Sequence, residues 1–165
     1  KLNYIIMNKF LSEFIYGSID GLITTFAIIS SSIGASIPNV YIIIISIASL
    51  LSDGYSMGIS RYLSYTAELK KNVQSKNPLI SGIYTFISFV IIGILPILPF
   101  IFLKDNIFQT SLVITLVLFL LIGIIKGLIL DSSIIRNAIE TLLLGGSAAL
   151  ISYYVGYYLK NQLNL

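Results

Sequence analysis

The stretch GLITTFAIISSSIGASIPNVYIIIISIASLLS, residues 21–52, contains 32 residues and carries no charge. A membrane-spanning helix needs about 20 mostly apolar residues, so this stretch is too long for one span. Pro38 lies in its small polar segment SSSIGASIPN. Proline and the residues around it disfavour a continuous helix. The stretch therefore predicts two membrane helices joined by a short turn.

The rest of the chain continues the same pattern. Uncharged runs occupy residues 77–103, 106–125 and 141–159, which gives five expected spans, at about 13–35, 39–63, 79–103, 107–129 and 134–159. Of the 165 residues, 56% are hydrophobic and 10% are charged, whereas a soluble domain carries about 25% charge. We expect an all-α, polytopic integral membrane protein that forms one membrane domain over residues 1–165, with no soluble domain.

Composition also limits the chemistry. The chain has no Cys and no His, which excludes disulfides, thiolate nucleophiles, Cys/His zinc sites and Ser-His-Asp triads within it. A net charge of +3 that rests on so few charges does not indicate nucleic-acid binding. We expect no tightly bound cofactor.

The distribution of Lys and Arg predicts the orientation. With the N-terminus inside, two cations, Lys104 and Lys160, fall outside. Eight fall inside: Lys1, Lys9, Arg61, Lys70, Lys71, Lys76, Lys126 and Arg136. This bias places the N-terminus inside, and the odd number of spans then places the C-terminus outside. Cell membrane and vacuolar-type membrane fit equally well.

Two carboxylates fall at membrane depth. Asp20 lies about 12 Å into the first span and Asp53 about 15 Å from the inner end of the second, at 1.5 Å per residue. They stand in the related strings SIDG (18–21) and LSDG (51–54). Ionisable groups at this depth are costly and mark function by default. The two could face one cavity, although burial against a Ser or Thr hydroxyl is the structural alternative.

Small and polar residues recur around both aspartates at helical spacing. In the first span they form the set Gly17, Asp20, Gly21 and Thr24, and in the second the set Ser46, Ser49, Asp53, Met57 and Ser60. Gly17 with Gly21, and Gly54 with Gly58, make G-x-x-x-G pairs, which allow close helix packing. Packing alone is the simpler interpretation of these glycines.

Met57 stands one turn from Asp53. Methionine on an apolar helix usually fills space, but beside carboxylates and hydroxyls its thioether is a candidate soft ligand. Such a set suits a borderline divalent ion such as Fe²⁺ or Mn²⁺, and suits Zn²⁺ poorly without His or Cys.

Three further features complete the pattern. Glu140, in the last span, either pairs with Lys126 across a short loop or takes part in proton or ion passage. Glu13 is expected to form a surface pair with Lys9 at the i,i+4 spacing. The segment GILPILPF (93–100) predicts a kinked helix with freed carbonyl groups.

Four strings together carry a family resemblance: FIYGSIDGLITTFAIISSSIGAS (14–36), LLSDGYSMGISRYLS (50–64), TFISFVIIGILPILPF (85–100) and NAIETLLLGGSAALISYYVG (137–156). In this order they resemble the vacuolar iron transporter (VIT1/CCC1) family over nearly the whole chain. The strings that begin with the two aspartates, DGLITTFA and DGYSMG, are the more specific ones.

The resemblance implies five helices, a homodimer through spans 1 and 2, and a metal path at the dimer interface. It implies proton-coupled export of Fe²⁺, often with Mn²⁺, from the cytosol. Asp20 and Met57 match the family's path residues, Asp53 falls in the same motif, and Glu140 matches an acidic position of the last helix. Thr24 is included in the expected ion pathway.

The sequence departs from the family in two places. Many iron-transporting members carry a long Glu-rich metal-binding domain between spans 2 and 3, but here the loop is SYTAELKKNVQSKNP (64–78), with the single acid Glu68. The chain is thus expected to be a member that lacks this domain. Arg61 stands where many members have an acid or a neutral polar residue, and a cation there should weaken the attraction of metal at the inner mouth.

Three functions compete at this stage. The first is a divalent metal/proton antiporter, in which metal binding to the carboxylates expels their protons; it is not an enzyme. The second is a transport-inactive membrane anchor or interaction module. The third, remote alternative is an intramembrane aspartyl protease built on a shared-proton carboxylate pair, although SIDG and LSDG lack the Y-D and G-x-G-D contexts of those proteases.

Overall fold

The computed structural model describes residues 10–70 and 77–163, and this part of the chain is all-helical. The helices are α2 (Leu11–Gly34), α3 (Asn39–Lys70), α4 (Pro78–Gly93), the 3₁₀ turn η1 (Leu95–Ile97), α5 (Leu98–Phe102), α6 (Ile107–Ile129) and α7 (Ile134–Leu163). Five segments are long and apolar enough to cross a membrane, with α4, η1 and α5 forming one of them. The protein is therefore a multi-pass integral membrane protein, as predicted.

The break predicted at Pro38 is present. Helix α2 ends at Gly34, Ser36 adopts a left-handed backbone with φ of 57°, and α3 begins at Asn39 directly after the proline. The amide of Ile37 donates to the carbonyl of Ser32 at 2.9 Å, which satisfies a carbonyl that the helix end would otherwise leave free. The second helix is longer than expected, because α3 continues beyond residue 63 to Lys70.

The predicted kink lies at the two prolines of the third span. Because proline cannot donate a backbone hydrogen bond, α4 gives way to η1 at Pro96 and then to the short α5, which begins just before Pro99. The carbonyl freed at Pro96 accepts a hydrogen bond of 2.7 Å from the Ser111 hydroxyl of α6. The kink thus binds the third span to the fourth.

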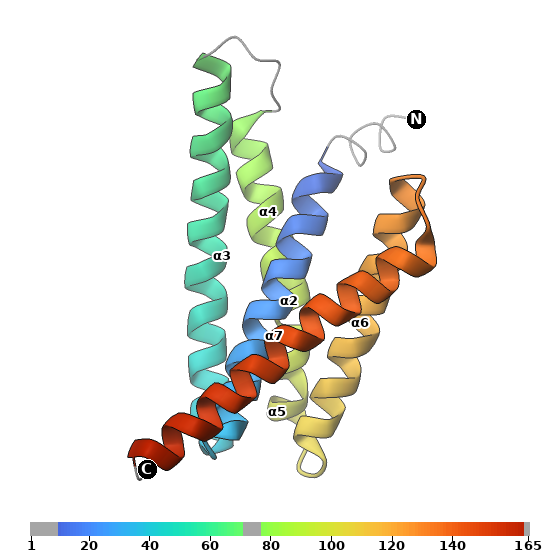
Figure 1. Ribbon diagram of the computed structural model, residues 1–165. Helices are drawn as coiled ribbons and strands as arrows, with labels where there is room; N and C mark the ends of the chain where they lie inside the picture. The colour runs from blue at the N-terminus through green and yellow to red at the C-terminus, as the bar shows by residue number, and fades with distance from the viewer. Residues whose placement is uncertain (1–9, 71–76, 164–165) are drawn as a thin grey trace.

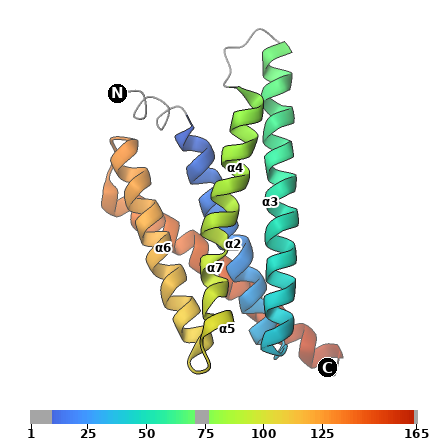
Figure 2. The same cartoon turned by 180° about the vertical axis from the view of Figure 1, so that it is seen from behind.

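Helix α2 lies at the centre of the bundle, because it contacts α3, α4, α6 and α7, whereas α4 packs on α2 and α3. Figure 1 shows α3, α4 and α2 running side by side, with α6 beyond them and α7 crossing α2 obliquely; Figure 2 shows α4 from behind. Two clusters of buried side chains hold the helices together. The larger contains Phe26, Ile29, Ile42, Leu50, Phe89, Ile97 and Phe100, and the smaller contains Leu22, Phe119 and Ile122.

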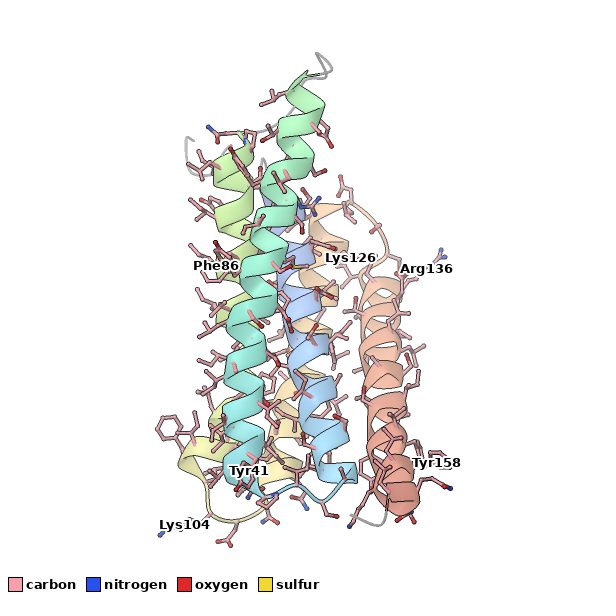
Figure 3. All side chains as sticks on the ribbon, turned by 90° about the vertical axis from the view of Figure 1, so that its left-hand side faces the viewer. Tyr41, Phe86, Lys104, Lys126, Arg136 and Tyr158 are labelled. Atoms are coloured by element: carbon pink, nitrogen blue, oxygen red, sulfur yellow. The ribbon has the colours of Figure 1, made fainter. Side chains whose placement is uncertain are left out.

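Three of the described cations lie toward opposite ends of the bundle. Lys126 and Arg136 lie near the end where α6 turns into α7, and Lys104 lies at the opposite end (Figure 3). This grouping is the one that the charge bias requires. Which end faces the cytosol stays a prediction, and the terminal and loop lysines 1, 9, 71 and 76 lie outside the described residues.

Candidate metal-transport site

Asp20 lies half-buried on α2, in a groove between α2 and α6 of about 530 Å³. Its neighbours in this groove include Tyr16, one turn away on the same helix, and Lys126 of α6. Asp53 lies on α3, which is in contact with α2, but it is not among the residues that line this groove. That the two aspartates face one cavity stays a prediction.

Asp53 belongs to a polar face of α3, which we define as Ser52, Asp53, Ser56, Ser60 and Ser64. All five side chains are exposed in the single chain. The Ser52 hydroxyl is 3.5 Å from an Asp53 carboxylate oxygen, at the long limit for a hydrogen bond. This face includes two of the residues predicted to form a polar stripe, Asp53 and Ser60, but not Ser46, which is fully buried.

Met57 is partly buried one turn from Asp53 and packs against the larger core cluster. It also lines a small cavity of about 170 Å³ with Tyr16, Ser60, Arg61 and Ser64. Tyr16 lines both this cavity and the Asp20 groove. Tyr16 therefore borders both the groove that contains Asp20 and the cavity that contains Met57, a position that the sequence did not reveal. Thr24 is half-buried one turn beyond Asp20.

Arg61 places its charge over two aromatic rings. Its guanidinium carbon lies 4.6 Å from the ring centre of Tyr16 and 5.7 Å from that of Tyr65. Cations within about 6 Å of an aromatic ring centre are attracted by its negative face. The Arg61 side chain thus lines the same small cavity as Met57 and Tyr16.

Glu13 is buried, which corrects the expectation that it lies at the surface. Its side chain has no exposed area, and one carboxylate oxygen accepts a hydrogen bond of 2.8 Å from the Tyr65 hydroxyl while the other accepts one of 2.9 Å from Ser12. Lys9, the expected partner, lies outside the described residues. Buried carboxylates need such donors, because an uncompensated charge is costly away from water.

The glycines of the two G-x-x-x-G pairs all face α4. A methyl group on Gly17 would come within 2.6 Å of the Thr85 carbonyl oxygen, and one on Gly21 would clash with the Phe89 carbonyl. The structure therefore splits the first predicted stripe. Gly17 and Gly21 touch α4, whereas Asp20 and Thr24 lie on a part of α2 that is only half-covered.

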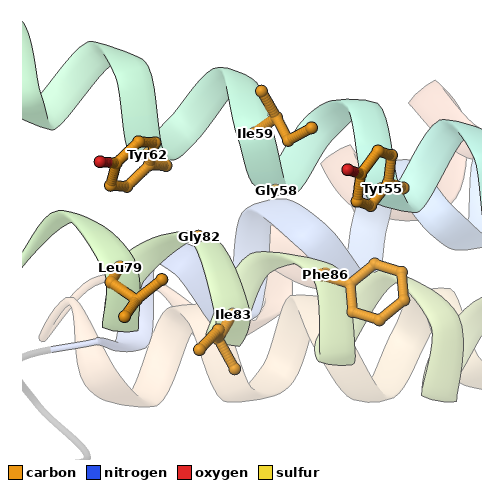
Figure 4. A pocket seen from close by; sticks show the side chains of 8 residues that line it. All are labelled: Tyr55, Gly58, Ile59, Tyr62, Leu79, Gly82, Ile83 and Phe86. Atoms are coloured by element: carbon orange, nitrogen blue, oxygen red, sulfur yellow. The ribbon is translucent and has the colours of Figure 1, made fainter.

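The second pair, Gly54 and Gly58, packs on α4 in the same way. A methyl group on Gly82 would come within 2.6 Å of the Gly58 carbonyl oxygen, so the two backbones lie in direct contact. Figure 4 shows the shallow apolar groove around this contact, which is lined by Tyr55, Gly58, Ile59, Tyr62, Leu79, Gly82, Ile83 and Phe86. It contains no carboxylate and is not a candidate metal site.

Glu140 and Lys126 form the ion pair that was one of their two predicted roles. The Lys126 ammonium donates to a Glu140 carboxylate oxygen at 3.3 Å, and the side chains are 26% and 52% exposed. Because Lys126 also lines the Asp20 groove, the pair joins Glu140 to that groove. A direct role of Glu140 in proton or ion passage stays a prediction.

One copy of the chain offers few acidic ligands at any one point. Over residues 10–70 and 77–163, no three Asp or Glu side chains come together as a metal-holding group. Asp20, Asp53 and Met57 are thus an incomplete ligand set within a single copy, since divalent ions of this kind take several ligands.

Comparison with known proteins supports the resemblance. Residues 11–71 and 65–157 match the model of the VIT family. The vacuolar iron transporter of Plasmodium falciparum (isolate 3D7) is 48% identical over 58 residues, which cover 35% of this chain and 21% of the relative. That of Plasmodium berghei (strain Anka) is 46% identical over 59 residues, which cover 36% and 22%.

A third relative, the vacuolar iron transporter of Toxoplasma gondii (strain ATCC 50861 / VEG), is 31% identical over 61 residues, which cover 37% of this chain and 20% of the relative. The matched segments thus make up about a fifth of each relative's own length. The family match is broader, because its two parts extend from the start of α2 into the second half of α7. With five membrane-spanning helices and a family match over most of its length, the chain belongs to the VIT family.

Proposed function

We propose that the protein transports a divalent metal, Fe²⁺ or Mn²⁺ or both, across a membrane, in exchange for protons and outward from the cytosol. The observation that carries this proposal is the position of Asp20 and Asp53 within two membrane-spanning helices that touch each other, where carboxylates are costly without a function. The matched relatives are named vacuolar iron transporters, which favours transport over the protease alternative and over any enzymatic role.

The ligand set consists of Asp20, Asp53 and Met57, with Thr24 and Glu140 along the pathway. Carboxylate oxygens and a thioether suit Fe²⁺ or Mn²⁺. Metal binding to carboxylates requires their deprotonation and so releases protons. With no His in the chain, the same carboxylates hold the metal and exchange the proton.

A homodimer completes this set. Asp53 and the serines of the polar face of α3 are exposed in the single chain, and an ionisable group at membrane depth faces protein or water rather than lipid. A second copy packed against this face and the neighbouring part of α2 would cover it and would double the number of carboxylates. The glycines of the two G-x-x-x-G pairs already pack on α4, so this interface is built from the polar residues instead.

Cysteine crosslinking tests the dimer, because the chain has no native Cys. We expect Ser56→Cys, on the polar face of α3, to crosslink two copies in the membrane. Ile91→Cys, on the exposed side of α4, is the matched control and should leave them apart. Crosslinking through Ile91 alone would place the interface elsewhere.

Uptake into proteoliposomes tests transport. The protein is reconstituted and exposed to anaerobic Fe²⁺, Mn²⁺, Zn²⁺, Ca²⁺ and Mg²⁺, with a pH gradient imposed and then reversed. We expect Fe²⁺ or Mn²⁺ to enter an acidic lumen as protons leave it, and uptake to fall when the gradient is reversed. Absence of uptake for every ion would leave the membrane-anchor alternative. Uptake that does not change with the pH gradient would contradict the proposed coupling to protons.

A further inference from the structure

Helices α6 and α7 enclose a cavity of about 540 Å³ that also reaches α2. The two helices touch closely near their shared turn, where a methyl group on Gly123 would come within 2.6 Å of the Ala138 Cα atom. Farther along they separate, and Figure 1 shows the wedge between them. At Gly146, on the cavity side of α7, an added methyl group would meet no atom within 4 Å. The cavity is thus a real space between two membrane helices.

The lining of this cavity is almost entirely apolar. It includes Phe26, Phe119 and Leu150, and two of its hydroxyl groups are already used within their own helices. The Thr115 hydroxyl donates to the Ser111 carbonyl and that of Ser147 to the Leu144 carbonyl, both at 2.8 Å. An occupant therefore needs no polar group to satisfy these side chains, which points to a hydrocarbon.

The cavity opens onto the membrane-facing side of α7. Leu143 and Leu150 line it and are 66% and 62% exposed, so its mouth is continuous with an apolar surface that lies within the span. The medium at such a surface is the acyl chains of the bilayer. Its volume falls within the roughly 300–1,000 Å³ of ordinary ligand pockets, so the space is large enough for more than a solvent molecule.

We propose that one acyl chain of a membrane phospholipid occupies this cavity and fills the wedge between α6 and α7. Nothing in this proposal depends on metal transport. A second copy of the protein is the competing occupant. The polar face that calls for a second copy belongs to α3, which contributes no residue to the cavity, whereas α2 contributes Phe26 and Ser30, so crosslinking at the mouth of the cavity must separate the two occupants. Lipid fills an apolar space beside it, because the atoms that line an empty space lose their van der Waals contacts.

Photolabelling of the full chain tests the proposal. The protein is reconstituted in vesicles of phosphatidylcholine and phosphatidylethanolamine with a trace of phosphatidylcholine that carries a diazirine on its acyl chain. After illumination, labelled peptides are mapped by mass spectrometry. We expect labelling at Leu116 and Leu142, which line the cavity, to exceed that at Ile151, an exposed residue of α7 outside it. Equal labelling at the two kinds of position in the wild-type chain would overturn the proposal.

Gly146→Leu places a larger apolar side chain at a position that lines the cavity and where an added methyl group meets no atom within 4 Å. We expect it to reduce labelling at Leu116 and Leu142 several-fold, while Ile151→Phe, which adds bulk to α7 outside the cavity, leaves that labelling unchanged. Unchanged labelling in Gly146→Leu would overturn the proposal, as would disulfide crosslinks between copies of a Leu143→Cys variant. If Gly146→Leu does not fold, Gly146→Ala makes the same comparison with a smaller expected decrease.

Discussion

The hydroxyl of Tyr65 donates a hydrogen bond of 2.8 Å to the carboxylate of Glu13, across 52 residues of sequence. This contact joins the start of α2 to the last turns of α3. Arg61 lies over the ring of the same tyrosine. Glu13, Tyr65 and Arg61 thus form one cluster. From the sequence, Glu13 was expected at the surface and Tyr65 in a loop.

We expect Tyr65→Phe to destabilise the protein, because it removes a donor from a carboxylate that has no exposed area. Hydrogen bonds to charged groups contribute about 1.5–3 kcal/mol, and the loss should fall near that range. The free energy of unfolding is measured by titration with sodium dodecyl sulfate in mixed micelles. Tyr55→Phe, at the exposed groove of α3, is the control and should be nearly neutral. Equal stabilities of the two variants would contradict the prediction.

Gly21 and Gly146 make a matched pair for testing helix contact. We expect Gly21→Ala to cost about 1–3 kcal/mol, the usual cost of overpacking, because its methyl group would strike the Phe89 carbonyl of α4. Gly146→Ala meets nothing within 4 Å and should be neutral, or more stable by up to about 1 kcal/mol from helix propensity. Thermal unfolding in detergent shows which of the two variants is the less stable. If Gly146→Ala were less stable than Gly21→Ala, α2 and α4 would not be in close contact.

Asp20→Ala should abolish the proposed metal transport, because it removes a half-buried carboxylate of the proposed ligand set. Fe²⁺ or Mn²⁺ uptake into inverted vesicles is expected to fall to the level of vesicles without protein. The control is Asp105→Ala, which removes an exposed carboxylate from the turn between α5 and α6 and should leave uptake unchanged. Undiminished uptake in Asp20→Ala would exclude Asp20 as a ligand.

Glu140→Gln should slow uptake, because the Lys126 ammonium then loses its partner and presents an uncompensated positive charge to the Asp20 groove. Its effect on stability should be small, about 0.2–1 kcal/mol, since the pair is partly exposed. The double variant Lys126→Met/Glu140→Gln separates the two roles of Glu140. Restored uptake means that Glu140 acts by pairing with Lys126, and uptake that stays low means that it carries ions itself.

The sequence was sufficient for the architecture because membrane spans depend on local signals. The number of helices followed from the length of the uncharged runs, and the turn at Pro38 and the kink at Pro96 followed from the missing backbone donor. The end of α3 was misplaced by several residues, since nothing between residue 63 and Lys70 forbids helix once the chain leaves the hydrocarbon.

The candidate site was less accessible to sequence reasoning because its geometry depends on contacts between distant residues. The periodicity put Gly17 and Asp20 in one stripe, but only α4 decides that the glycine is covered and the aspartate is not. The burial of Glu13 depends on Tyr65. The place of Tyr16 had one available signal, its spacing of four residues from Asp20, which puts both on one face of the helix.

The glycine contacts around α4 also determine which parts of the protein can move against each other. Helices α2 and α3 touch α4 backbone to backbone at Gly21 and Gly58, so sliding any of the three would force atoms together in an interior that does not compress. These three helices must therefore travel as one rigid body. Any movement that admits or releases an ion must then occur where the packing is looser. These places are the groove between Asp20 and α6 and the proposed interface with a second copy.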